Sequence, residues 1–179
     1  MPDVLASPPH VDVAVLRGVR RALDRPVPVG AARALSTVGE HAAGWTLVAL
    51  SGALLRPAER RPWLEAGAVV LASHATSVVL KRVVRRPRPD LADAPPLVGT
   101  PSRLSFPSSH ATSTTAAAVV LTPLLGRSPA ARAVAVALVA AMGTSRVLLG
   151  VHYPSDVLAG SALGGATALG ARRLLRGHR

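Results

Sequence analysis

Five apolar stretches, separated by short segments rich in arginine, proline and glycine, dominate this 179-residue chain. They run over about 41–55, 64–80, 110–126, 133–149 and 157–171. A helix needs ~20 residues to cross a bilayer, and arginine side chains at its ends extend a shorter one by reaching to the interface. Residues 115–125 and 133–143 are apolar on all sides, whereas a helix of a soluble bundle shows a polar stripe. The pattern therefore favours an all-α, polytopic transmembrane helical bundle of about five spans over a soluble five-helix bundle.

The composition agrees with a membrane protein and excludes several functions. Apolar residues make up 49% of the chain, aromatic residues only 2%, and the formal net charge is +12. So few aromatic rings argue against a protein that binds nucleic acid by stacking its bases, despite the positive charge. Because the chain has no cysteine, it has no disulfide framework, no Cys-ligated zinc and no thiol nucleophile.

The expected organisation has three parts: a polar tail with an interfacial helix, a transmembrane domain, and a basic tail, over residues 1–40, 41–172 and 173–179. The interfacial helix is predicted over 11–25. Its apolar face carries valines (Val11, Val15 and Val19), and its other face carries arginines (Arg17, Arg20 and Arg21). A basic amphipathic helix of this kind lies in the membrane interface. A surface helix packed on its own protein is an equally good interpretation.

Two further features concern packing and orientation. Gly160 and Gly164 form a G-x-x-x-G step in the last apolar stretch, which suits close helix packing and a homo-oligomer formed through it. Basic residues other than Lys81, Arg88 and Arg146 are equally distributed between the two ends of the predicted spans. The positive-inside rule therefore does not orient the chain in its membrane.

Three segments carry the polar residues with the clearest chemistry. They are Lys81-x6-Arg88-Pro89, Pro107-Ser108-Ser109-His110 and Ser145-Arg146-x5-His152-x3-Asp156. If five spans alternate in direction, all three segments meet at one membrane face. Lys81, the only lysine, would there join Arg88 and Arg146. Three cations suit a dianionic phosphate, because guanidinium groups bind its oxygens in a fork and an ammonium adds a point charge.

The histidines supply the reactive groups. His152 comes just before the last helix, and Asp156 lies in its first turn, close enough to hold one ring nitrogen and leave the other as a nucleophile. His110 is available to protonate a leaving oxygen. Ser108 follows a proline and is a predicted N-cap, so the amides behind it favour an anion. Asp90 and Asp93 are interpreted as solvated loop carboxylates, and no metal site is predicted.

The three segments resemble the signature of the type-2 phosphatidic acid phosphatase superfamily: K-x6-R-P, P-S-G-H and S-R-x5-H-x3-D. They occur in the family's order over residues 81–156, with one departure, since Ser109 replaces the glycine. The resemblance implies that His152 forms a phosphohistidine, that Asp156 orients it, and that His110 protonates the leaving group and then activates water. It implies a phosphate-binding set of Lys81, Arg88, Arg146, Ser108 and Ser109. No metal or other cofactor is implied.

The implied function is a membrane-embedded hydrolase of a lipid phosphate monoester or diphosphate, multi-pass in a bacterial cell membrane. The substrate is of the phosphatidic acid type or is polyprenyl-linked. The short, Ala/Arg-rich chain also resembles phosphatases that act on a decaprenyl-linked phosphoribose in actinobacterial cell-wall synthesis. The alternative is a non-catalytic protein that binds or translocates an anionic lipid. The intact pair of His152 and Asp156 argues against it, because binding alone needs only the cations.

The remaining ionisable residues have plainer interpretations. His10 and His178 lie in the tails and are assigned no role, and His74 is expected to be a hydrogen-bonded interior histidine. Glu40 and His41 open the first apolar stretch and are weaker candidates for contact with a lipid head group. Three arginines after the lysine are predicted to form a collar that attracts phospholipids rather than to act on substrate: Arg82, Arg85 and Arg86.

Overall fold

The computed structural model describes residues 9–177, and the regular elements in this range are helices, apart from one isolated β-bridge between Pro87 and Leu104. The long helices are α1 (His10–Leu23), α2 (Pro26–Gly39), α3 (Ala43–Leu55), α4 (Arg60–Val84), α5 (Ser109–Leu125), α6 (Pro129–Leu148) and α7 (Pro154–Gly177). Two short 3₁₀ helices are η1 (Glu40–Ala42) and η2 (Pro57–Glu59). The all-α prediction is confirmed.

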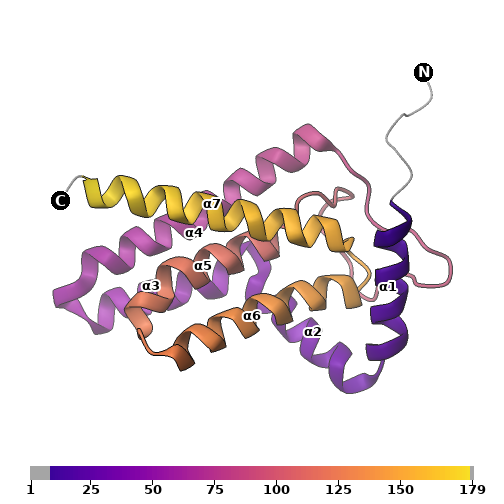
Figure 1. Cartoon of the computed structure of the whole chain (residues 1–179), viewed down its shortest axis with the longest axis horizontal. Coiled ribbons are helices and arrows are strands. Elements are labelled where there is room, and N and C mark those ends of the chain that lie inside the picture. Colours follow the sequence, from indigo (N-terminus) through magenta and orange to yellow (C-terminus); the bar gives the residue numbers. More distant parts are fainter. Residues whose placement is uncertain (1–8, 178–179) are drawn as a thin grey trace.

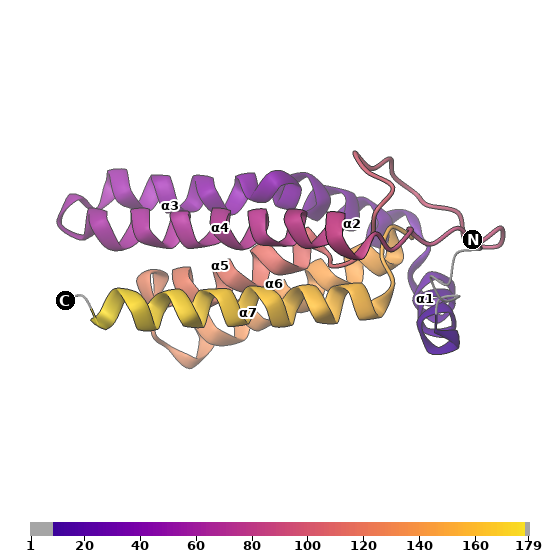
Figure 2. The same cartoon turned by 90° about the horizontal axis from the view of Figure 1, so that it is seen from above.

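Helices α3 to α7 run along the long axis of the molecule, with α1 across one end (Figure 1). Viewed from above, α3 and α4 form one layer and α7 belongs to the other (Figure 2). Helix α5 packs against α4, α6 and α7 and so forms the centre of the bundle. Its buried residues Ala116, Ala117 and Val120 pack with Val70 of α4. Small side chains at this centre allow the helix backbones to approach closely.

The G-x-x-x-G step in α7 mediates packing between two helices of the same chain. A Cβ atom at Gly160 or Gly164 would collide with the carbonyl oxygen of Ser108 or Thr112 in α5. The two glycines therefore let α7 lie directly against α5. This corrects the prediction that the step joins two copies of the protein, because α5 already covers that surface.

Helix α1 is found where it was predicted, but it packs through a different face. Its buried residues are Asp12, Leu16 and Arg20, whereas Val11 and Val15 are 73% and 44% exposed. The Nη1 atom of Arg20 donates hydrogen bonds to the carbonyl oxygens of Pro95 and Leu148 at 3.0 and 3.3 Å. Helix α1 thus packs against the rest of the protein through a largely polar face, while the exposed side chains of Val11 and Val15 remain available to a membrane interface.

Helix α2 was not predicted, and its first residues include Pro26 and Pro28. Both prolines lie in the first helical turn, where backbone N–H groups have no partner within the helix and proline is tolerated. At the other end of the chain, α7 continues through 173–177, so most of the predicted basic tail is helical. His178 and residues 1–8 of the N-terminal tail lie outside the described residues.

The five apolar stretches coincide with α3 to α7, but they differ in length. Within residues 9–177, two helical segments are long and apolar enough to cross a membrane, Pro57–Val84 and Pro129–Leu148. Helices α3 and α5 have only 13 and 17 residues. The count of five spans therefore remains a prediction.

Candidate active site

A cavity of about 340 Å³ lies at one end of the bundle, which is within the usual range for a small-molecule pocket. Helices α4 and α6 end there, and α5 begins there. The cavity is lined by six of the eight predicted site residues: Lys81, Arg88, Ser109, His110, Arg146 and His152. The loop after α4 lies at the same end, opposite to the C-terminus (Figure 1). The structure thus brings the three polar segments together.

His152 lies in the turn between α6 and α7 and is 3% exposed. Its Nδ1 atom lies 3.5 Å from Oδ2 of Asp156, and its Nε2 atom lies 3.2 Å from Nη1 of Arg88. Because a guanidinium group only donates hydrogen bonds, Nε2 accepts this one, and the proton of the neutral ring is on Nδ1. The lone pair therefore lies on Nε2, beside the cations of the cavity.

The surroundings of His152 also keep its ring neutral. Burial, and then the positive charges of Lys81, Arg88 and Arg146, lower the pKa of His152 well below its ordinary value. At neutral pH the imidazole is therefore uncharged, which is the form that can act as a nucleophile.

Four buried polar atoms of residues at the cavity have no hydrogen-bond partner in the described part of the chain, and two of them belong to Arg146 and Ser109; the others are Nδ1 of His74 and Nδ1 of His152. Arg146 is 3% exposed, and its Nη1 atom donates to Oγ of Ser36 at 3.1 Å, but its Nη2 atom is unpaired. The hydroxyl of Ser109 is also buried without a partner. An unpaired buried charged group is costly, at about 1–3 kcal/mol or more. An anion in the cavity would accept hydrogen bonds from both groups.

Lys81 and Arg88 also hold the loop that covers the cavity. The Nζ atom of Lys81 donates to the carbonyl oxygens of Ser105 and Pro107 at 2.9 and 2.7 Å. The Nε atom of Arg88 donates to the carbonyl oxygen of Ser102 at 2.8 Å. These two cations therefore position the loop as well as adding positive charge, a role that the sequence did not predict.

Ser108 and Ser109 have separate places. Ser108 is the N-cap of α5, as predicted: its Oγ atom accepts a hydrogen bond from the amide of Ala111 at 3.4 Å. Ser108 is fully buried and does not line the cavity. The assignment of Ser108 to the phosphate-binding set therefore stays a prediction, and Ser109 is the serine of this pair that lines the cavity.

His110 is held by α2 and η1, which sequence reasoning did not connect with it. Its Nε2 atom lies 3.1 Å from the carbonyl oxygen of Ser36 and 3.7 Å from Oε2 of Glu40. Gly39 allows this approach, since a Cβ atom there would lie 2.6 Å from Cδ2 of His110. Helix α2 thus orients the second histidine.

Arg86 does not belong to a surface collar, and that prediction is wrong for this residue. Its Nη1 atom donates to Oδ1 of Asp156 at 2.8 Å, and its Nη2 atom donates to Oδ2 of Asp12 at 2.8 Å. Its guanidinium group also lies 4.4 Å from the ring centroid of Tyr153. Arg86 therefore links the carboxylate beside His152 to helix α1, and no sequence motif indicated the partner in α1.

The carboxylate of Asp12 is fixed from two sides. It accepts hydrogen bonds from Arg86 and from the backbone amide of Ser155, the latter at 2.9 Å. Burial raises the pKa of Asp12, but the hydrogen bonds from Ser155 and Arg86 outweigh burial and hold this pKa below its ordinary value. Asp12 therefore remains ionised at neutral pH.

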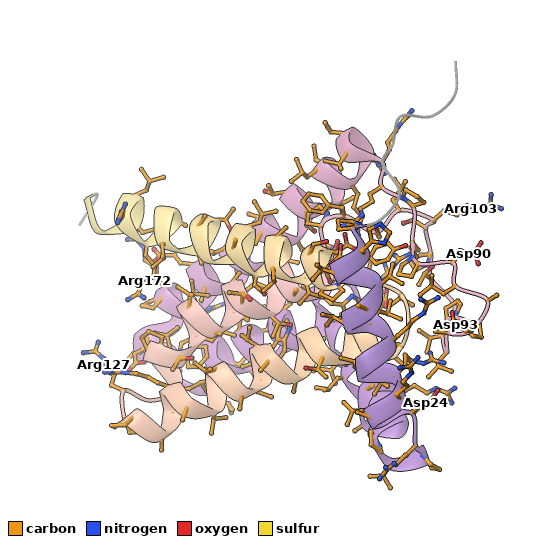
Figure 3. The ribbon with its side chains drawn as sticks, turned by 45° about the vertical axis from the view of Figure 1, so that its right-hand side comes forward. Asp24, Asp90, Asp93, Arg103, Arg127 and Arg172 are labelled. Atoms are coloured by element: carbon orange, nitrogen blue, oxygen red, sulfur yellow. The ribbon has the colours of Figure 1, made fainter. Side chains whose placement is uncertain are left out.

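Three weaker candidates also line the cavity: Glu40, His41 and His74. The expectation of a hydrogen-bonded His74 is wrong, because its Nδ1 atom is buried and unpaired within the described residues. Its ring centroid lies 6.1 Å from that of His41. Away from the cavity, Asp90 and Asp93 lie at the outer edge of the loop (Figure 3). Asp93 pairs with Arg17 at 2.8 Å.

The all-helical bundle brings two histidines and three basic side chains, Lys81, Arg88 and Arg146, to one cavity, and this arrangement suits a protein that acts on a phosphate anion. The profile of the PAP2 superfamily matches residues 62–178, so the chain belongs to this superfamily of phosphatases. Decaprenylphosphoryl-5-phosphoribose phosphatase of Mycolicibacterium smegmatis is 53% identical over 87% of this chain and 84% of that protein. The protein of the same name from Mycobacterium tuberculosis is 53% identical over 87% of this chain and 86% of that protein.

Solved structures with the same fold agree with this assignment. The transmembrane PAP2-type phosphatidylglycerolphosphate phosphatase of Bacillus subtilis superposes with a TM-score of 0.79, at 23% identity, over 94% of this chain and 86% of that chain. LpxE of Aquifex aeolicus gives a TM-score of 0.73 at 20% identity over 91% and 95% of the two chains. At these identities the likeness concerns the fold.

Proposed function

We propose that this protein is a multi-pass membrane phosphatase that removes the terminal phosphate of decaprenylphosphoryl-5-phosphoribose. The observation that carries the proposed chemistry is the placement of His152, with Nδ1 beside Asp156 and Nε2 beside the guanidinium group of Arg88. The relatives with 53% identity over most of both chains support this substrate. Two long apolar helices and the transmembrane protein with the same fold support the membrane location.

In the first chemical step, Nε2 of His152 attacks phosphorus and the bond between phosphorus and the ribose oxygen breaks. His110 donates a proton to the departing alkoxide, because such a poor leaving group needs one. Asp156 stabilises the positive charge that develops on the imidazole. The products of this step are a phosphohistidine and a lipid-linked ribose with a free hydroxyl group.

In the second step, His110, now neutral, takes a proton from water, and the resulting hydroxide attacks the phosphohistidine. The bond between phosphorus and nitrogen breaks, which releases inorganic phosphate and restores neutral His152. In both transition states, negative charge on the phosphoryl oxygens is stabilised by Lys81, Arg88 and Arg146, with the Ser109 hydroxyl as an additional donor. Preorganised donors of this kind are typically the largest contribution to catalysis.

Phosphate release from purified protein in detergent tests this proposal. The substrates are decaprenylphosphoryl-5-phosphoribose, a polyprenyl phosphate and a phosphatidic acid, each with and without EDTA. We expect the first substrate to give the highest kcat/KM, His152→Ala to abolish turnover, and EDTA to leave it unchanged. Binding of the lipid without phosphate release by the unmodified protein would instead support the non-catalytic alternative. Loss of activity in EDTA, with recovery on adding magnesium or zinc, would contradict a mechanism that uses only the protein's cations.

A further inference from the structure

We propose that Glu40, His41 and His74 form a second subsite, beside the phosphate-binding residues, that hydrogen-bonds the vicinal hydroxyl groups of a pentose head group. The inference rests on the proposed function and specifies what recognises the substrate next to its phosphate. None of these three residues belongs to the motifs that define the phosphate site.

The three side chains form a continuous wall of the same cavity. Glu40 and His41 come from η1, and His74 comes from the middle of α4. The carboxylate of Glu40 lies 3.7 Å from Nε2 of His110, so the wall adjoins the reactive groups. Glu40 also lies 3.4 Å from Nδ1 of His41, whose ring faces that of His74 at 6.1 Å between centroids. A group attached to the phosphate would therefore meet these residues first.

Glu40 places a negative charge in a cavity whose other charged side chains are suited to binding an anion. It is the only carboxylate among the residues that line the cavity. A carboxylate repels a phosphate dianion, but its two oxygens accept hydrogen bonds from neighbouring hydroxyl groups. Dinucleotide-binding proteins hold a ribose hydroxyl with an Asp or Glu side chain in this way. A sugar next to the phosphate therefore suits Glu40, whereas a plain alkyl phosphate gives it nothing to bind.

His74 provides an independent sign that a ligand is bound at this wall. Its Nδ1 atom is buried and has no hydrogen-bond partner in residues 9–177. Buried polar groups are nearly always paired, so an unpaired one beside a cavity indicates a partner from outside the chain. A hydroxyl group is suitable, because it both donates and accepts and can pair with either tautomer of the imidazole.

The backbone of η1 is held in an unusual conformation at this point. His41 has φ 49° and ψ 25°, and Ala42 has φ 59° and ψ 16°, so two successive residues other than glycine lie in the left-handed region. Such residues are uncommon, and strained backbone of this kind concentrates at functional sites. Here the strained segment carries two of the three proposed subsite residues.

The competing interpretation is that Glu40 acts only through His110, by aiding its proton transfer. The two interpretations differ in their dependence on substrate. A partner of His110 affects every substrate whose leaving group needs a proton. A sugar-binding residue affects only substrates that carry the hydroxyl groups.

The experiment compares kcat/KM for the lipid-linked 5-phosphoribose and its 2-deoxy analogue, using the unmodified protein, Glu40→Ala and His74→Phe. We expect the unmodified protein to prefer the diol at least tenfold, and each variant to lose most of that preference. Glu59→Gln is the matched control, since Glu59 is exposed on η2 and does not line the cavity. It removes one negative charge and should retain the full preference.

A second measurement does not depend on turnover. Soluble ribose 5-phosphate and 2-deoxyribose 5-phosphate are compared as competitive inhibitors, and the difference in their Ki values should disappear in Glu40→Ala. An equal loss of kcat/KM on both lipid substrates, with unchanged Ki values, would overturn the subsite and assign Glu40 to His110. If the unmodified protein does not hydrolyse the phosphoribosyl lipid but does hydrolyse another lipid phosphate, the proposed substrate fails. If it hydrolyses the diol and the deoxy analogue equally well, only the subsite fails.

Discussion

At the scale of single residues, the two histidines are distinguished by the groups that hold them. His152 is bracketed by Asp156 and Arg88, which leaves its Nε2 atom as the acceptor. His110 instead lies beside a backbone carbonyl group and a carboxylate of the α2–η1 segment. The first arrangement suits the proposed nucleophile, and the second suits a group that passes a proton to and from the substrate. Three predictions follow from this difference and from the surrounding cations.

The first prediction separates the roles of the histidines by leaving group. An alkoxide needs a proton to depart, whereas p-nitrophenolate departs without one. His110→Ala should therefore lose about 100-fold or more in kcat on a lipid monophosphate, in line with general acid catalysis, and about tenfold or less on p-nitrophenyl phosphate. Quench-flow with labelled substrate should trap phosphohistidine in His110→Ala and none in His152→Ala. The reverse pattern would assign the nucleophile to His110.

The second prediction concerns the protonation of His152. Because burial and three cations lower the pKa of His152, its ring should stay neutral below pH 6.5, where an ordinary imidazole becomes charged. The folded state then takes up this proton less readily than the unfolded chain. The contribution of neutral His152 to the stability of the folded state is therefore complete above pH 6.5 and declines as the pH falls. A ¹⁵N NMR titration of labelled histidines, assigned with His152→Asn, measures this directly. A midpoint for His152 near 6.5 would contradict it.

The third prediction concerns the only lysine. Lys81 lines the cavity and anchors the loop through Ser105 and Pro107. Lys81→Ala should lower kcat/KM by about 100-fold or more, the usual effect of removing a preorganised donor. Arg85 lies four residues further on, is exposed and does not line the cavity, so Arg85→Ala should stay within about threefold. Equal losses on the same lipid phosphate would mean that both residues act only as surface charge.

At the scale of helices, α1 is part of the active site although it carries no residue of the cavity. Its Asp12 holds Arg86, and Arg86 holds the carboxylate beside His152. The chain of contacts therefore runs from an outer helix to the proposed nucleophile. A helix with the sequence pattern of an interfacial helix is thus connected by hydrogen bonds to the carboxylate beside His152.

Asp12→Ala tests this connection. Breaking a buried ion pair costs about 3–5 kcal/mol, and Arg86 would be left with Asp156 alone. We expect a lower Tm and a kcat reduced about tenfold, with little change in KM, because the phosphate-binding cations are not touched. Asp12→Glu should restore part of the kcat.

The control is Asp90→Ala, which removes an exposed carboxylate at the outer edge of the loop after α4. Surface substitutions of this kind change stability by about 0.5 kcal/mol or less, so both kcat and Tm should remain close to those of the unmodified protein. If Asp12→Ala lowers Tm but leaves kcat unchanged, α1 stabilises the fold without positioning Asp156.

At the scale of the whole molecule, the chain is a bundle with two different ends. Arg103, Asp90 and Asp93 project from the end that carries the cavity, and Arg127 and Arg172 lie at the other (Figure 3). If the bundle crosses a bilayer, the two ends face different compartments. Because the chain has no cysteine, single cysteines can be introduced without interfering thiols.

Arg103→Cys and Arg127→Cys therefore test whether the bundle crosses the membrane. Both arginines are exposed, so both cysteines should react with maleimide in detergent. In sealed vesicles, a membrane-impermeant maleimide should label only one of the two variants, and labelling of the other should require permeabilisation. Labelling of both in intact vesicles would place the two ends on one side and contradict a transmembrane bundle.

The sequence alone determined the helical class, and it singled out six residues that the structure places around one cavity. Apolar stretches that lack a polar stripe predict helices, because their backbone groups must pair within the segment wherever water is excluded. The spacing Ser145-Arg146-x5-His152-x3-Asp156 places an arginine, a histidine and a carboxylate near the ends of two successive helices. Because successive helices alternate in direction, the sequence also predicts that the polar segments meet at one end of the bundle, where the cavity lies. Local sequence also placed Ser108 at the N-cap of α5.

Only the tertiary structure decided the partners that lie far apart in the chain. Asp12 and Arg86, Ser36 and His110, and Glu40 beside the phosphate site are pairings over long separations, and no local periodicity encodes them. The same holds for the G-x-x-x-G step, whose spacing predicts close packing but not the partner helix. The proline-containing segment of α2 became helical because its prolines lie in the first turn and its later residues pack against α6 and α5. The local sequence allows several conformations and several partners for such segments. Tertiary packing decides among them, and it is seen only in the folded molecule.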